Sequence, residues 1–105
     1  MPKYTLAYVG GSQPSSPEEG QQVMAAWMSW MGGLGEALID GGAPFSGSTA
    51  LSSSGQGDAS SGLTGYSILQ ADSLDDAVAK SQGCPHIGAG GTIEIYEQHD
   101  MSDMM

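Results

Sequence analysis

The segment 17–38 most restricts the fold of this chain, because its apolar residues cover more than one face of a helix. Ser16 is a preferred N-cap residue, Pro17 suits the first helical turn, and two acids that favour the positive helix end follow. Helical spacing produces two apolar stripes, namely Val23, Trp27, Trp30, Leu34 and Leu38, and beside them Met24, Met28 and Met31. One small domain rarely buries both stripes, so the methionines need another chain, a ligand or a covering loop.

Length and charge set further limits. The chain of 105 residues predicts one domain spanning 1–105, and 39% hydrophobic residues suffice for one core. Twelve acidic residues stand against two lysines and no arginine, for a net charge of -10. Nucleic acids and anionic membranes both require cationic contacts. We therefore expect no nucleic-acid partner and no membrane partner.

The single cysteine excludes an internal disulfide and any metal site built from several cysteines. No apolar run approaches the roughly 20 residues of a membrane span. The segment 1–10 lacks the charged start, apolar stretch and cleavage site of a secretory signal, so we expect a cytoplasmic protein. The glycine-rich segment 88–91 precedes a predicted strand, whereas a dinucleotide-binding loop opens a helix, so no cofactor is expected.

Most of the remaining chain is typical of strands. Three segments follow the two-residue period of a strand: 3–9, 64–71 and 91–97. Within the second of these, Tyr66 and Ile68 point to one face, and Leu69 and Ala71 point to the other. A further short strand is expected at 37–39.

A second, shorter helix follows the strand 64–71, because Ser73 is an N-cap residue and Asp76 completes a weak capping box. Gly83 ends this helix. The order of the elements predicts an α+β fold, a ferredoxin-like plait with an antiparallel sheet and two helices on one face. Apolar side chains on both strand faces predict a homodimer that pairs sheet against sheet, forming a dimeric α+β barrel.

Two segments lie outside this pattern. Residues 46–62 are mostly Ser and Gly and predict a flexible hairpin tip or an exposed loop, in which 49–51 can form a short edge strand. Residues 98–105 form an acidic, methionine-rich tail without period. His99 and the Asp and Met residues of this tail resemble a set of copper ligands, but a terminal segment without regular structure is not expected to hold a metal.

Several motifs resemble the YCII-related (DGPF) family. They are GYSI at 65–68, ADSLDDA at 71–77, GCPH at 83–86 and GGTIEI at 90–95. The opening strand and GEALIDGGAP at 35–44 are also similar, so the resemblance covers nearly the whole chain. It implies a dimeric α+β barrel of ferredoxin-like subunits, and it implies no settled activity.

The chain departs from that family in two places. The Asp-Gly-Pro-Phe motif should precede Gly65, where this chain reads GDASSGLTG. Some members carry a first-helix histidine and a nearby aspartate, proposed as an acid-base pair. The matching positions here are Ala26 or Trp27 and Gly35, so that pair is absent.

The candidate binding residues are Trp27, Trp30, Asp40, Tyr66 and His86. The two tryptophans and the methionines suit an apolar or aromatic ligand, or they simply pack on the sheet. His86 either meets a ligand at the barrel mouth or bonds backbone in its turn. Asp40 acts as an acid or base, or it stabilises a turn. Cys84 is two residues from His86, but the end of a helix disfavours a thiolate, so we expect a packing cysteine.

These observations leave three functional interpretations. The favoured one is a homodimeric module that binds a small apolar or aromatic molecule between the first helix and the sheet. A second is a small enzyme that uses His86 or Asp40 for proton transfer, and no complete catalytic set is identified. A third is a non-catalytic assembly or regulatory partner, whose contacts come from the Ser/Gly loop and the acidic tail.

Overall fold

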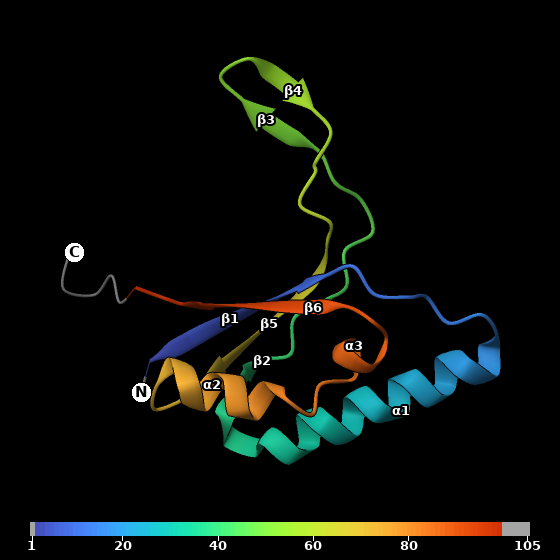
Figure 1. The fold of residues 1–105 in the computed structure, drawn as a ribbon, viewed down its shortest axis with the longest axis vertical. Helices are drawn as coiled ribbons and strands as arrows, with labels where there is room; N and C mark the ends of the chain where they lie inside the picture. Colours follow the sequence, from blue (N-terminus) through green and yellow to red (C-terminus); the bar gives the residue numbers. More distant parts are fainter. Residues whose placement is uncertain (1, 100–105) are drawn as a thin grey trace.

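The computed structural model describes residues 2–99 and has a mixed α+β fold. A four-stranded antiparallel sheet carries helices on one face, and a two-stranded hairpin projects beyond the other face (Figure 1). The sheet consists of β1 (Lys3–Val9), β2 (Leu38–Asp40), β5 (Leu63–Gln70) and β6 (Thr92–Glu97). The helices are α1 (Pro17–Leu34), α2 (Leu74–Ser81) and α3 (Pro85–Gly88), and the hairpin is β3 (Ala50–Ser52) with β4 (Gly55–Gly57). No helix within residues 2–99 is long and apolar enough to span a membrane.

The strand order is β2-β5-β1-β6, and all neighbouring strands are antiparallel. The predicted strands at 3–9, 64–71, 91–97 and 37–39 are therefore all present, with small shifts at their ends. The central strand β1 pairs with β5 from Lys3 opposite Gln70, and with β6 from Tyr4 opposite Glu97. This arrangement places the two long predicted strands beside each other at the centre of the sheet.

The core lies between the sheet and the helices. Alternation along β1 and β5 sends every second side chain to the helix side, and these residues are buried. They pack with side chains from α1, α2 and β6 in one cluster: Tyr4, Leu6, Tyr8, Leu69, Ala71, Ala77 and Cys84, against which Trp27, Trp30, Leu34, Ile93 and Ile95 pack. The predicted opposite facing of Tyr66 and Leu69 is confirmed by this burial pattern.

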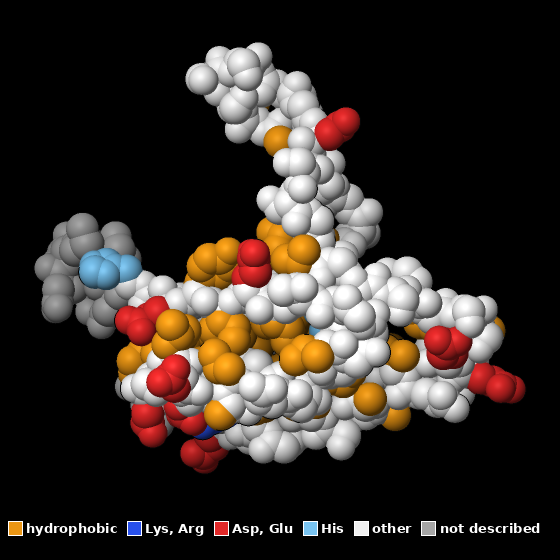
Figure 2. Space-filling model, in the orientation of Figure 1, with side chains coloured by type: hydrophobic (Ala, Val, Ile, Leu, Met, Phe, Trp, Pro, Cys, Tyr) orange, Lys and Arg blue, Asp and Glu red, His pale blue; other side chains and the backbone are white. Residues whose placement is uncertain are grey.

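The other face of the sheet is covered by no helix in the described part of the chain (Figure 1). Alternation places on it the apolar residues Ala7, Val9, Tyr66, Ile68 and Tyr96. Phe45 stacks on Tyr66 with ring centroids 6.0 Å apart and extends this apolar surface. Hydrophobic side chains also gather beside the base of the hairpin (Figure 2). We refer to these six residues as the open face.

Helix α1 begins where the sequence predicts and ends four residues early. The Ser16 hydroxyl accepts a hydrogen bond from the Glu19 backbone N–H at 3.1 Å, and Pro17 occupies the first turn. At the other end Gly35 adopts φ +56°, a left-handed value that glycine tolerates, and the chain continues as the 3₁₀ turn η1 (Gly35–Ala37). Leu38 consequently belongs to β2 and not to the helical stripe. No residue of α1 is fully buried.

The Ser/Gly segment 46–62 contains more regular structure than predicted. Residues 49–51 were expected to form a single short edge strand, whereas β3 and β4 pair antiparallel, from Ala50 opposite Gly57 to Ser52 opposite Gly55. The side chain of Leu51 is 83% exposed at this hairpin. Figure 1 shows the hairpin on the side of the sheet that α1 and α2 leave open. The segment adds nothing to the core, as its polarity predicts.

The region after α2 also differs from the prediction. Two helices were expected, with His86 in a turn, but Pro85 opens a third short helix, α3, which contains His86. The predicted capping of α2 is confirmed, because the Ser73 hydroxyl accepts from the Asp76 backbone N–H at 3.1 Å. Helix α3 turns the chain back toward β6 and sets His86 against the end of β1.

Candidate functional site

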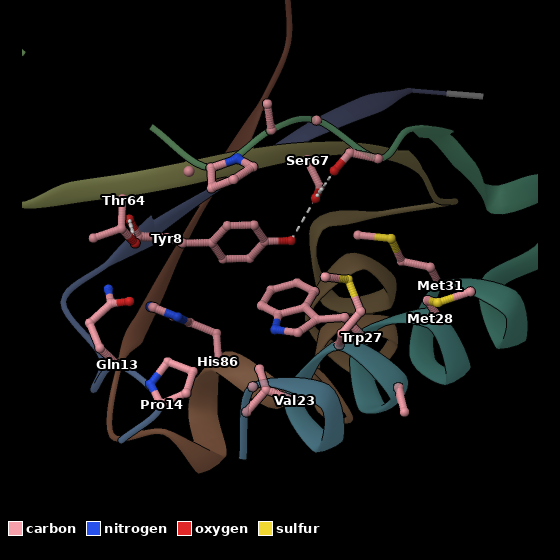
Figure 3. Close-up of a pocket in the computed structure, with 18 of the residues that line it drawn as sticks. Tyr8, Gln13, Pro14, Val23, Trp27, Met28, Met31, Thr64, Ser67 and His86 are labelled. Atoms are coloured by element: carbon pink, nitrogen blue, oxygen red, sulfur yellow. Dashed lines mark hydrogen bonds between the residues drawn. The ribbon is translucent and has the colours of Figure 1, made fainter. Parts of the chain in front are cut away.

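A cavity of about 1000 Å³ lies between α1 and the helix side of the sheet. Several segments line it, as Figure 3 shows. They are the end of β1, the loops 12–14 and 41–44, residues 64–67 of β5, and residues of α1 and α3. The cavity exists because α1 contacts the core through its second half, whereas its first half extends past the sheet (Figure 1). This volume accommodates a small organic molecule.

Aromatic rings form the inner wall of the cavity. Tyr8 meets Trp27 edge-to-face, with ring centroids 5.1 Å apart, and Tyr8 also lies 5.3 Å from the His86 ring. Trp27 in turn packs edge-to-face on Trp30 at 5.7 Å. Such contacts orient rings that would otherwise move freely. The cavity therefore has a rigid wall from His86 through Tyr8 to Trp27 (Figure 3).

The methionine stripe of α1 forms the facing wall. Met24, Met28 and Met31 all line the cavity, and the first two are 64% and 69% exposed. The loop 41–44 covers only the end of the stripe, because a Cβ added at Gly41 would touch the sulfur of Met31. The sequence predicts that the methionine stripe is covered, and in the structure the loop 41–44 covers only part of it. Unbranched, polarizable methionine side chains adapt to apolar ligands of different shapes.

The loop 41–44 can lie this close to β5 only because of glycine. Gly42 has φ +73°, and a Cβ at this position would clash with the backbone carbonyl of Tyr66. The Ser67 hydroxyl donates to the Gly41 carbonyl at 2.9 Å and holds the loop in place. The Tyr8 hydroxyl donates to Ser67 Oγ at 2.7 Å. A chain of hydrogen bonds therefore runs from the aromatic wall to the loop (Figure 3).

Burial raises the pKa of the Tyr8 hydroxyl well above its ordinary value, and the hydrogen bond with Ser67 only partly opposes this effect. Tyr8 is therefore a neutral phenol at physiological pH. It contributes an apolar ring and a hydroxyl oxygen to the cavity, and it is not a base there.

His86 is 8% exposed and lies between two glycines. A Cβ at Gly91 would clash with its ring, and one at Gly11 would lie 2.8 Å from Cε1, so both positions need glycine. The ring nitrogen Nε2 lies 3.0 Å from the Val9 carbonyl oxygen. Because a carbonyl oxygen only accepts, Nε2 carries the hydrogen. This bond fixes the ring at the edge of the cavity.

Cys84 is buried beneath this site and is unsuited to act as a nucleophile. Burial raises the pKa of its thiol, and hydrogen bonds with the His86 backbone and the Tyr8 side chain only partly oppose the shift. A thiol that stays protonated is a weak nucleophile. Its contacts are those of the packing cysteine that the sequence predicts.

The structure brings together the side chains of two of the five predicted binding residues, Trp27 and His86, at the cavity. Tyr66 is also among the lining residues, but its ring lies on the open face and stacks on Phe45. The Trp30 indole N–H donates to the Lys80 carbonyl at 3.1 Å and ties α1 to α2. Asp40 is not among the lining residues, and its carboxylate accepts from the Gly42 N–H at 2.8 Å and the Tyr66 hydroxyl at 3.3 Å. Asp40 thus has the turn role that was its alternative.

Sequence reasoning missed Tyr8 and Ser67 as site residues. Tyr8 lies in the predicted strand 3–9 and Ser67 in the predicted strand 64–71. Alternation predicts the face of the sheet that each side chain occupies, and it does not predict a role in a site. A signal did exist in the glycine pair at 41–42, since two adjacent glycines before a proline indicate a close backbone approach. The loop 12–14 gave no signal of a binding role.

Residues 2–99 contain no group of three or more His, Cys, Asp or Glu side chains placed to hold a metal ion. The copper-like set of the tail, which is not expected to hold a metal, lies mostly in 100–105, outside the described residues. No family model matches the chain, and the curated proteins include no significant match. The resemblance to the YCII-related family therefore stays a prediction.

Proposed function

We propose that the protein is a homodimeric, cytoplasmic module that binds a small apolar or aromatic molecule in the cavity between α1 and the sheet. The cavity itself is the observation that carries this proposal. Its volume of about 1000 Å³ and its walls of Trp27, Tyr8 and methionines suit such a ligand. No lysine or arginine is among the lining residues, so a neutral ligand fits better than an anion.

The ferredoxin-like plait and the dimeric α+β barrel belong to the same proposal. The strand order β2-β5-β1-β6, with α1 and α2 on one face, supports the plait. The open face supports the dimer, because a second copy would cover Tyr66, Phe45 and Tyr96. The resemblance to the YCII-related family supports the same assembly.

An enzyme that uses His86 or Asp40 is the alternative. Asp40 gives the enzyme alternative little support, because its carboxylate stabilises the turn at Gly42 and is not among the residues that line the cavity. His86 supports it better, since it borders the cavity. The exposed hairpin with Leu51 favours a third candidate, an assembly role, in which the hairpin reaches a partner.

A neutral fluorescent probe, N-phenyl-1-naphthylamine, tests the binding proposal. We expect wild-type protein to bind one probe per chain with micromolar affinity. Met28→Glu places a charge on the exposed methionine wall and should weaken binding about tenfold, because an apolar ligand would desolvate that charge. Ser29→Glu adds the same charge next to it, at an exposed position outside the lining, and should change the affinity less than about twofold.

Circular dichroism of both variants confirms that α1 is intact. Equal binding by Met28→Glu and wild-type protein would place the probe elsewhere and contradict the proposed site. A wild-type protein that binds no probe would contradict the function itself.

A further inference from the structure

The hydroxyl groups of the cavity-lining residues share one property, which is that each donates its hydrogen to another group of the protein. Tyr8 and Ser67 donate along the chain that ends at the Gly41 carbonyl. The remaining three donate at 3.1 to 3.3 Å, Ser12 to the Ala89 carbonyl, Thr64 to the Tyr8 carbonyl, and Tyr66, whose ring lies on the open face, to the Asp40 carboxylate. A hydroxyl has one hydrogen, so these groups have none left to donate to a ligand.

His86 adds an acceptor to the same wall. Its Nε2–H is engaged with the Val9 carbonyl, so Nδ1 carries a free lone pair. Nδ1 makes no hydrogen bond among the described residues, and none of their buried side-chain nitrogen or oxygen atoms lacks a partner. Nδ1 therefore reaches accessible space, and His86 borders the cavity. Figure 3 shows the ring between Tyr8 and the loop that carries Gln13.

Two kinds of side-chain donor remain around the cavity. The Trp27 indole N–H of the inner wall bonds to no other described residue, and the amides of Gln13 and Gln21 are exposed to solvent at the rim. A hydrogen bond to an exposed amide competes with water and discriminates weakly. A bond to the nearly buried His86 competes less with water. The inner wall therefore offers an acceptor at His86 Nδ1 and a donor at the Trp27 indole N–H, and a ligand hydroxyl can use both.

We propose that the ligand is a neutral aromatic molecule with an O–H or N–H group, of the phenol, naphthol or indole class, and that this group donates to His86 Nδ1. The inference rests on the proposed function, and it adds the ligand's chemical class and a specificity-determining residue. A carboxylate ligand is disfavoured, because no lysine or arginine is among the lining residues and the chain has a net charge of -10.

Competition of 1-naphthol and 1-methoxynaphthalene against N-phenyl-1-naphthylamine tests this proposal. The two competitors share a ring system, and only the naphthol donates a hydrogen bond. We expect wild-type protein to prefer 1-naphthol about fivefold. His86→Phe keeps a ring against Tyr8 but offers no acceptor, and it should bind both competitors equally. Gln22→Ala, at an exposed position of α1 outside the cavity lining, is the control and should keep the wild-type preference.

The ratio of the two affinities separates recognition from support of the fold. A merely structural His86 would weaken both competitors alike in the variant and leave their ratio unchanged, which would overturn the proposal. Equal binding by the wild-type protein would overturn it without any variant. If the probe binds and neither competitor displaces it, the ligand class is wrong and the binding function stands. If no aromatic compound binds, the function and the inference both fail.

Discussion

Tyr8 joins the core to the cavity, and its hydroxyl should govern how stability depends on alkaline pH. Burial raises the pKa of this phenol above its ordinary value of 10.0, so the folded chain keeps the proton that the unfolded chain loses. The contribution is complete below pH 10 and declines above it, by about 1.4 kcal/mol for each pH unit until the folded phenol ionises. Tyr8→Phe should cost about 1 kcal/mol at pH 8 and remove this part of the decline.

Urea denaturation at pH 8 and near pH 11 measures the difference. Tyr96→Phe is the control, because Tyr96 is 54% exposed and its hydroxyl meets only Glu94. Its pKa is raised mainly by that hydrogen bond, which solvent screens. Parallel decline of the Tyr8 variant and the wild-type protein would assign the alkaline transition to other groups, such as the buried thiol of Cys84.

For single residues, the sequence predicts which types of side chain line the cavity better than it predicts which groups those side chains contact. Trp27 and Trp30 are equivalent in the helical pattern, yet one lines the cavity and the other bonds to Lys80. Alternation gives the face of Tyr8 and Ser67, whereas their contact depends on the register that sets Leu6 opposite Ser67. The register depends on pairing between strands whose contacting residues, Tyr8 and Ser67, are 59 positions apart in the chain. The local sequence pattern does not specify that pairing.

At the scale of elements, the N-cap of α2 should matter more than that of α1. Helix α2 has eight residues and buries Ala77 in the core, so it depends on its cap and its packing. Ser73→Ala removes the acceptor of the Asp76 N–H and should lower the free energy of unfolding by about 1 kcal/mol. Ser16→Ala removes the equivalent cap of α1, no residue of which is fully buried, and should cost clearly less.

Urea denaturation of both variants gives the comparison, with Ser60→Ala in the exposed segment 46–62 as the control. An equal loss in the two capping variants would mean that the start of α1 unfolds together with the core. The cavity would then be a rigid part of the fold and not one bordered by a separately fraying helix end.

Periodicity and capping residues predict most elements, because these signals are local. The strand 3–9 and the start of α1 at Pro17 follow from them directly. The hairpin at 50–57 could not be predicted in full, since Ser and Gly carry little strand propensity and the pairing there does not bury a face. The early end of α1 depends on which of three nearby glycines adopts a left-handed conformation, and Gly35 does so.

At the scale of the whole molecule, the open face should decide the oligomeric state. We expect a dimer at about 10 µM by sedimentation velocity, since a specific interface of standard size supports such an affinity. Tyr96→Asp charges the open face and should weaken the dimer more than about tenfold. Leu74→Asp is the matched control, because Leu74 has a similar exposure of 47% but begins α2, on the helix side. A monomeric wild-type protein would contradict the proposed barrel.

Salt should strengthen this dimer, and that direction distinguishes an apolar interface from an ionic one. Two chains of net charge -10 repel each other, and screening shortens the range of that repulsion to about 8 Å at 0.15 M salt. Hydrophobic contact between open faces is not weakened by the same ions. Raising NaCl from about 10 to 150 mM should therefore lower the dimer dissociation constant several-fold. A dimer that dissociates with salt would instead be held by ion pairs, for which the exposed Lys3 offers the obvious cation, and the open face would not be its contact surface.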